Sequence, residues 1–277
     1  LAEQEALVAE VEGYQKVIDG ARQVVAHYKP RITIDPSWEM VELGEVVKEA
    51  QYGLSEKMNT DGKGWKCFRM SEIQGGLAVD TGEMKCADIS EQDLLKYKLY
   101  PGDILFNRTN SYEHVGKTGI FELQGDYVFA SYLVRLKVKD GVNPWFINYV
   151  INTDAFQADL KRFVSRAIGQ ANINVRSLQT CLVPLPPLRE QERIVADLEE
   201  ERRMVEGCRA LIARMEAKVR ERVARVWSPS PAASAADGDG GSDVQRVEGS
   251  EHAKPGQGHS GTAVPPKNYD APDMQVN

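Results

Sequence analysis

The sequence contains few of the residues that would support a metal centre, a disulfide framework or a membrane anchor. Its 277 residues include four cysteines and four histidines, no two cysteines stand in a C-x-x-C spacing, and no histidine cluster accompanies them. A zinc site and a disulfide framework are therefore not expected. Isolated thiols are typical of a reducing cytoplasm, where we expect the protein to reside. No apolar run approaches the roughly 20 residues that a transmembrane helix needs, so no membrane partner is expected.

The chain also lacks an excess of positive charge. The chain has 34 lysine and arginine residues against 41 aspartate and glutamate residues, which gives a net charge of −7. Duplex DNA repels negative surface, so this balance argues weakly against a nucleic-acid binder that relies on overall charge. A DNA-binding function would depend on local groups of basic residues.

An internal repeat links the start of the chain to a segment 187 positions later. Residues 1–5 (LAEQE) match residues 188–192 (LREQE), and the alignment continues without gaps. The further identical pairs are Val8 and Val195, Ala9 and Ala196, Glu12 and Glu199, Gly20 and Gly207, Arg22 and Arg209, and Ala26 and Ala213. Because the repeat begins at Leu1, where no globular segment stands before it, we expect an upstream copy of the segment that precedes Leu188.

Both copies of the repeat carry an apolar seam with alternating steps of four and three residues. The first seam is Leu7, Val11, Tyr14, Ile18, Ala21, Val25 and Tyr28. The second seam is Ile194, Leu198, Glu201, Val205, Cys208, Ile212, Met215 and Val219, with a polar break at Glu201. This spacing is typical of coiled-coil heptads. Since a globular segment joins the two helices, we expect them to pack against each other in an antiparallel arrangement. The alternative is that each is an amphipathic helix that packs on an ordinary globular core.

The middle of the chain has a different pattern. Short apolar runs separated by glycine and proline predict strands near residues 38–41, 104–106 and 180–185, and a hairpin formed by residues 119–123 and 127–138. Residues 144–152 and 155–163 are predicted to be helical. The fold class is therefore α+β: one strand-rich domain (37–187) between two long helical segments (1–36 and 188–227), followed by a disordered, Ser/Pro/Gly/Asp-rich tail (228–277).

Several of these stretches resemble the specificity subunits of type I restriction–modification systems. Residues 12–22, 28–30 and 34–36 are similar to the central spacer region of that family. Residues 169–175 and 184–191 (PLPPLREQ) are similar to the junction between a recognition domain and a spacer helix, and residues 101–105 (PGDIL) to an interior strand. The resemblance covers residues 1–227 and leaves out the tail.

This resemblance implies a non-catalytic subunit that reads one half of a bipartite double-stranded DNA target. Its antiparallel helices would set the distance between half-sites and bind methyltransferase subunits, and a motor–nuclease subunit would join for cleavage. S-adenosylmethionine, ATP and Mg²⁺ would be bound by those partners. The chain holds one recognition domain where the family has two, so we expect either a truncated subunit, which the start within a motif favours, or a half-subunit that self-associates.

Two motifs that could suggest catalysis are incomplete. Residues 143–146 (NPWF) differ from the tetrad of amino-methyltransferases, in which a second proline follows the first, and no glycine-rich cofactor loop precedes them. A helix start with Pro144 near its first position is the better interpretation. Residues 116–118 (GKT) lack the earlier glycine of a phosphate-binding loop, since Ser111 stands there. No catalytic residue is therefore predicted.

Two basic groups, one from Lys161 to Arg176 and one from Lys63 to Arg69, and the polar segment 107–111 with Lys117 nearby are candidates for DNA contact. Basic and amide side chains bind phosphates or form paired hydrogen bonds with base edges; a solvated loop is the alternative for each. The candidates are Lys63, Lys66, Arg69, Arg108, Asn110, Lys117, Arg162, Arg166, Asn172 and Arg176. The competing functions are a coiled-coil scaffold whose middle domain binds protein, and a DNA adenine methyltransferase fragment.

Overall fold

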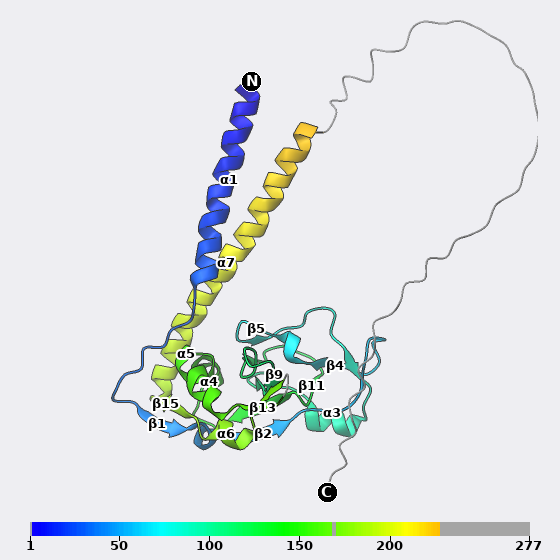
Figure 1. The fold of residues 1–277 in the computed structure, drawn as a ribbon, viewed down its shortest axis with the longest axis vertical. Helices are drawn as coiled ribbons and strands as arrows, with labels where there is room; N and C mark the ends of the chain where they lie inside the picture. The colour runs from blue at the N-terminus through cyan, green and yellow to red at the C-terminus, as the bar shows by residue number, and fades with distance from the viewer. Residues whose placement is uncertain (1, 168–169, 228–277) are drawn as a thin grey trace, which may run out of the picture. The chain divides into compact units, whose positions relative to one another are not determined.

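The computed structural model describes residues 2–167 and 170–227, and Leu1–Trp227 form one compact unit. The tail predicted to be disordered, residues 228–277, lies outside the described residues. The two longest helices are α1 (Ala2–His27) and α7 (Leu188–Trp227), with 26 and 40 residues. At 1.5 Å per residue they span about 39 and 60 Å. They lie side by side, and the strand-rich part of the chain, residues 37–187, is attached at one end of the pair (Figure 1).

The two helices run antiparallel, as predicted. Arg22 Nη2 lies 2.6 Å from Glu216 Oε1, and closer to the start of α1 Glu10 Oε1 lies 2.9 Å from Arg222 Nη2. Residue numbers thus rise in α7 as they fall in α1. Beyond the end of α1, the Tyr28 hydroxyl donates to Glu201 Oε2 at 3.1 Å, which gives the polar break in the second seam a partner.

The apolar seams are the inward faces of these helices for part of their length. Ile18 and Val205 are 2% and 6% exposed, and the other apolar seam residues from Leu7 to Val25 and from Ile212 to Val219 are at least partly buried. Ile194 and Leu198, predicted to serve the coiled coil, instead belong to the core of residues 37–187. The reason is length: α7 is 14 residues longer than α1, and its first turns have the strand-rich part as their neighbour.

The strands described form four sheets. The largest has the order β2-β12-β8-β10-β6-β5, made of β2 (Val47–Tyr52), β12 (Leu133–Val138), β8 (Ile104–Asn107), β10 (Thr118–Ile120), β6 (Leu77–Ala78) and β5 (Ile73–Gln74). A second has the order β11-β4-β7-β3, made of β11 (Tyr127–Phe129), β4 (Trp65–Phe68), β7 (Cys86–Ala87) and β3 (Met58–Asn59). The third is β13 (Ser165–Ala167), β14 (Gln170–Asn172) and β9 (Thr109–Asn110), and the fourth is β1 (Glu39–Glu42) with β15 (Leu182–Leu185). The mixed composition confirms the α+β class.

Short helices cover these sheets. They are α2 (Leu43–Val46), α3 (Glu91–Tyr97), α4 (Pro144–Ile151), α5 (Asp154–Leu160) and α6 (Val175–Gln179), with single 3-10 turns at Met70–Glu72 and Lys161–Phe163. One core lies between α4, β8, β10, β12 and the start of α7, and includes Phe106 and Phe146. A second core contains aromatic and aliphatic side chains, and in it Phe68 and Phe121 meet edge to face with ring centroids 5.5 Å apart. The four cysteines are unbridged.

The predicted hairpin of residues 119–123 and 127–138 is wrong. β10 pairs with β8 and β6, β11 pairs in parallel with β4, and β12 pairs with β2 and β8. Residues 130–132 interrupt the apolar run and carry the chain from the second sheet into the first. At this crossing Ala130 donates its amide to the Phe68 carbonyl and forms a bridge with Leu54.

In the described part of the chain, no helix combines the length and apolar character that crossing a bilayer requires. Among the same residues, no group of three or more histidine, cysteine, aspartate or glutamate side chains is arranged to hold a metal ion.

Candidate nucleic-acid interface

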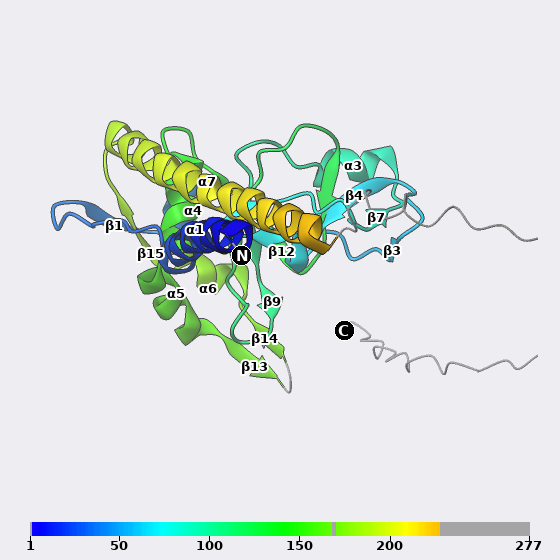
Figure 2. The ribbon, with the colours of Figure 1, turned by 90° about the horizontal axis from the view of Figure 1, so that it is seen from above.

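The three-stranded sheet gathers four of the predicted DNA-binding residues. Asn110 lies in β9 and Asn172 in β14, which pairs with β9 on one side and β13 on the other. Arg166 lies in β13, where its backbone is described, and Arg108 directly precedes β9. Figure 2 shows β9, β14 and β13 next to one another and away from β3, β4 and β7.

The guanidinium of Arg108 is held from two sides. Its Nη2 donates to Oδ1 of Asn172 at 3.2 Å, and its central carbon lies 4.9 Å from the centroid of the Tyr52 ring. The backbone is fixed as well, because the Arg108 amide donates to the Tyr132 carbonyl at 3.0 Å and its carbonyl accepts from the Ile173 amide at 2.9 Å. These contacts keep the planar set of guanidinium donors in a defined orientation.

A lysine beside this sheet anchors the loop that follows β9. Lys161 Nζ donates to the Val115 carbonyl at 2.8 Å and also to the Tyr112 carbonyl. Burial lowers the pKa of Lys161. Lys161 therefore stabilises the loop between β9 and β10, and its neighbour Arg162 is 73% exposed and paired with Asp159.

The basic cluster of β4 is largely engaged within the fold. Lys66 Nζ lies 2.6 Å from Asp80 Oδ2, and this hydrogen bond raises the pKa of Lys66 and lowers that of Asp80. Arg69 Nη2 lies 2.7 Å from Oε1 of Glu72, whose side chain is 1% exposed. Lys63 is exposed in the turn between β3 and β4. To bind DNA, Lys66 and Arg69 would have to leave internal carboxylates, so the structure does not present this cluster as a free basic surface.

The other two candidates lie apart from one another. Lys117 is exposed just before β10, and it lines a groove of about 660 Å³ between α4, the β5–β6 turn and α7. Arg176 is exposed in the first turn of α6. The structure thus places the ten candidates in several groups, and the group that it assembles from distant parts of the sequence is that of the three-stranded sheet.

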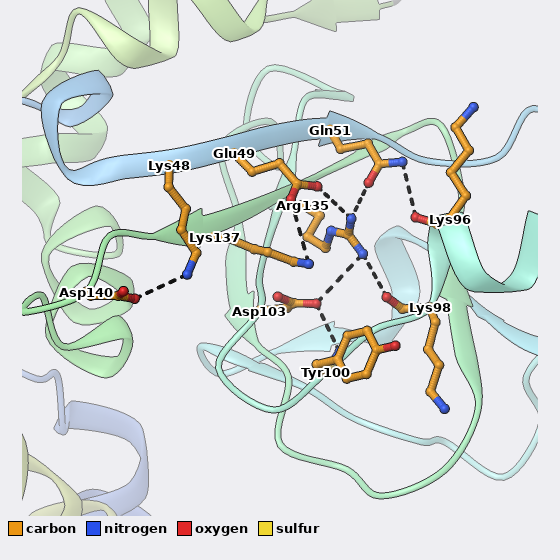
Figure 3. Close-up of polar contacts among 10 residues, drawn as sticks. All are labelled: Lys48, Glu49, Gln51, Lys96, Lys98, Tyr100, Asp103, Arg135, Lys137 and Asp140. Carbon is orange, nitrogen blue, oxygen red and sulfur yellow. Dashed lines mark hydrogen bonds and ion pairs between the residues drawn. The ribbon is translucent and has the colours of Figure 1, made fainter.

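A buried arginine ties β12 to β2 and to the segment before β8 (Figure 3). Arg135 is 4% exposed; its Nη2 lies 2.7 Å from Glu49 Oε1 and also donates to Gln51, and its Nη1 donates to the Lys98 carbonyl at 2.7 Å. Nη1 also lies 4.0 Å from Oδ2 of Asp103. Gln51 directly precedes Tyr52, and β8 leads directly to Arg108, so this network positions the strands that carry both residues.

The NPWF motif begins a helix. Asn143 Oδ1 accepts the amides of Trp145 and Phe146 at 2.9 and 3.2 Å, as an N-cap does. The Asn143 amide donates to Gln191 Oε1 at 2.8 Å, and Gln191 Nε2 donates to the Pro186 carbonyl at 2.8 Å. The interpretation of this motif as a helix start is confirmed, and the glutamine of the LREQ motif connects α7 to α4.

A second contact between α4 and α7 lies two turns further along α7. The Tyr149 hydroxyl donates to Glu199 Oε1 at 2.5 Å, and Arg202 Nη2 lies 2.6 Å from Glu199 Oε2. Val195, between Gln191 and Glu199 on the helix, packs against the core. Gln191, Val195 and Glu199 thus hold the strand-rich part together with Ile194 and Leu198, which lie in its core.

The repeat places equivalent residues on α1, where they are exposed. Subtracting 187 from 191, 195 and 199 gives positions 4, 8 and 12, occupied by Gln4, Val8 and Glu12. The Val8 side chain is 54% exposed, and all three residues line a shallow surface groove. α1 therefore carries a copy of the face with which α7 holds a globular part.

Sequence reasoning missed the roles of Tyr52 and Glu199, and it placed Lys161 in a basic stretch without predicting that Lys161 anchors a loop. The contacts of Tyr52 and Lys161 join segments more than 40 residues apart in the sequence, so no local pattern could have placed them. Glu199 did have a signal, because it is identical to Glu12 in the repeat although both stand off the apolar seam.

Comparison with known proteins identifies the family. A model of the family described as "Type I restriction modification DNA specificity domain" matches residues 36–205. The chain is 31% identical over 169 residues to a Methanocaldococcus jannaschii protein named as the MjaX specificity subunit of a type I restriction enzyme, and 30% identical over 158 residues to the EcoKI specificity subunit of Escherichia coli. These alignments cover 60% and 56% of this chain but only 40% and 34% of the relatives, so the chain spans less than half of their length.

A solved structure from work on the assembly and conformational transition of the type I R-M system has a TM-score of 0.51 to this chain, with 22% identity. It covers 79% of this chain and 56% of that one, a likeness that shows the fold alone. The family match, in contrast, spans more than half of the 277 residues and includes the strand-rich part, the LREQ motif and the first half of α7. The chain belongs to the type I restriction modification DNA specificity family.

Proposed function

We propose that residues 37–187 read one half of a bipartite double-stranded DNA site without catalysing a reaction. The observation that carries this proposal is the three-stranded sheet, which places Arg108, Asn110 and Asn172 in one region of a family member. Their side chains are of the types that bind base edges and phosphates. The net charge of −7 makes a local contact surface of this kind necessary.

The helices α1 and α7 supply the second part of the proposed function. An antiparallel pair of this length is rigid enough to fix the separation of two half-sites, which is a geometric quantity. The same pair offers exposed helical faces to methyltransferase subunits, and a motor–nuclease subunit would join for cleavage. S-adenosylmethionine, ATP and Mg²⁺ would be bound by those partners.

The exposed face of α1 supports self-association as a further part of the assembly. Gln4, Val8 and Glu12 repeat the residues with which α7 holds the strand-rich part. In this proposal, the strand-rich part of a second copy of the chain binds Gln4, Val8 and Glu12 as the first copy's strand-rich part binds their α7 equivalents.

The test of DNA reading is selection from a random duplex library by the chain mixed with its cognate methyltransferase subunit, at two salt concentrations. We expect enrichment of a short half-site and weaker retention at the higher salt, because phosphate contacts release counterions. An inverted pair of identical half-sites would add support for self-association. If the methyltransferase binds and no sequence is enriched, the chain is a scaffold and the proposal fails.

A further inference from the structure

We infer that Arg108 recognises a guanine in the major groove, with Tyr52 and Asn172 as the residues that position it. This inference rests on the proposed function and names a base that the same surface would read.

The charge environment of Arg108 differs from that of the partly buried Arg69 and the buried Arg135. Arg69 is paired with Glu72, and Arg135 with Glu49. Within the described residues, the polar contact of the Arg108 guanidinium is with the neutral amide oxygen of Asn172, and no carboxylate lies within ion-pair distance. A partly buried cation without a counter-charge is unfavourable for the fold. The side chain is therefore placed for an acceptor that a ligand supplies.

The geometry favours a base edge over a phosphate. Guanine presents O6 and N7 side by side in the major groove, and a guanidinium donates to both at once. That contact needs a fixed plane, which the Tyr52 ring at 4.9 Å and the Asn172 hydrogen bond at 3.2 Å provide. Phosphate contacts position a protein but carry no sequence information, and they do not need a side chain held in one plane.

Arg108 is partly exposed, so a ligand can reach its guanidinium, although Nε is buried without a hydrogen-bond partner among the residues that the structure describes. Tyr52, which stacks on the guanidinium, is 44% exposed, and Tyr132, whose carbonyl binds the Arg108 amide, is 45% exposed. The site stands at the end of the core strand β8, where Phe106 is 1% exposed, so its backbone belongs to the rigid part of the fold. Rigid support of this kind is what base discrimination requires.

The experiment combines protein variants with an altered base. The half-site enriched by the wild-type chain with its methyltransferase subunit is synthesised with each guanine in turn replaced by 7-deazaguanine, which lacks the N7 acceptor. We expect one position at which this replacement weakens wild-type binding about 10-fold or more, as loss of a bidentate contact does. Arg108→Ala should bind the normal and 7-deaza sites equally, because the contact is already absent.

Variants of the positioning residue Tyr52 and a control substitution test whether the loss of guanine discrimination is specific to Arg108. Tyr52→Leu should reduce the discrimination and Tyr52→Phe should retain it, since the phenylalanine ring restores the stack. Lys139→Ala, which removes an exposed cation just after β12 that is not among the ten candidates, should keep the full 7-deaza effect. If Arg108→Ala weakens all sites uniformly and keeps the guanine preference, Arg108 binds phosphate and the inference is overturned while the proposed function stands. If the wild-type chain enriches no half-site, both fail.

Discussion

Arg135 brings a positive charge into the region between β12, β2 and the segment before β8. Asp103, 4.0 Å from its Nη1, is 4% exposed, and burial raises the pKa of that carboxyl group. Arg135→Met would leave this carboxylate buried without its cation. We expect the free energy of unfolding to fall by about 3–5 kcal/mol near neutral pH, the usual cost of breaking a buried pair. Urea denaturation followed by tryptophan fluorescence measures this change.

The control for this substitution is Arg162→Met. Arg162 is 73% exposed and its partner Asp159 has solvent available, so its loss should change stability by less than about 0.5 kcal/mol. Adding Asp103→Asn to Arg135→Met should recover part of the stability, because the second change removes the stranded charge. A double variant no more stable than Arg135→Met would show that packing, and not charge, determines the loss.

At the scale of single elements, the contact between α1 and α7 depends on apolar burial more than on ion pairs. The pair of Arg22 and Glu216 is 53% and 35% exposed, and such surface pairs contribute about 1 kcal/mol or less. Ile18 is 2% exposed at the seam, and the adjacent Val17 is 43% exposed. Ile18→Asp should therefore abolish hydrogen-exchange protection of the α1 amides, whereas Val17→Asp should leave it intact. Equal protection in both variants would show that burial of the seam residue Ile18 does not hold α1 against α7.

The contact of Glu199 with Tyr149 and Arg202 predicts a pH dependence. Burial raises the pKa of Glu199, but hydrogen bonds from Arg202 and Tyr149 outweigh it, and the net pKa lies below the usual 4.5. A folded-state pKa below the unfolded value means that the stabilisation is present above pH 4.5 and is lost as the pH falls through the folded value. Glu199→Gln should cost about 1–3 kcal/mol at pH 7.

The difference between wild type and Glu199→Gln should then shrink as the pH falls below 4.5. Chemical denaturation at a series of pH values measures it. Glu200→Gln is the matched control, because Glu200 is the exposed neighbour on the same helix. A difference that stays constant down to pH 3 would mean that the carboxylate of Glu199 is not what stabilises the contact.

The elements that were predictable are those whose signal is local. The seams predicted α1 and α7, and the globular segment between them predicted their antiparallel arrangement. Pro144 marked the start of α4, and a proline–glycine turn preceded β8. The strand order was not predictable, because β2 pairs with β12 from about 80 residues away, with Tyr52 opposite Val134. The sequence identified Arg108 as a candidate for the same local reason. It could not predict that Arg108 stacks on Tyr52, the contact that orients its guanidinium, because the two residues are far apart in the sequence.

At the scale of the whole molecule, the repeat predicts how copies of the chain associate. Gln4, Val8 and Glu12 are exposed on α1, while their equivalents on α7 hold a globular part. We expect a concentration-dependent dimer in sedimentation velocity, and we expect Val8→Asp to raise its dissociation constant at least about 10-fold, since a charge would replace an apolar contact. Val17→Asp is the control, because nine residues at about 100° each place Val17 on the opposite side of α1 from Val8.

A chain that remains monomeric at every concentration, or a dimer that Val8→Asp and Val17→Asp weaken equally, would show that the repeated face does not bind a second copy. A dimer lost only in Val8→Asp would place the second globular part on the residues that repeat Gln191, Val195 and Glu199.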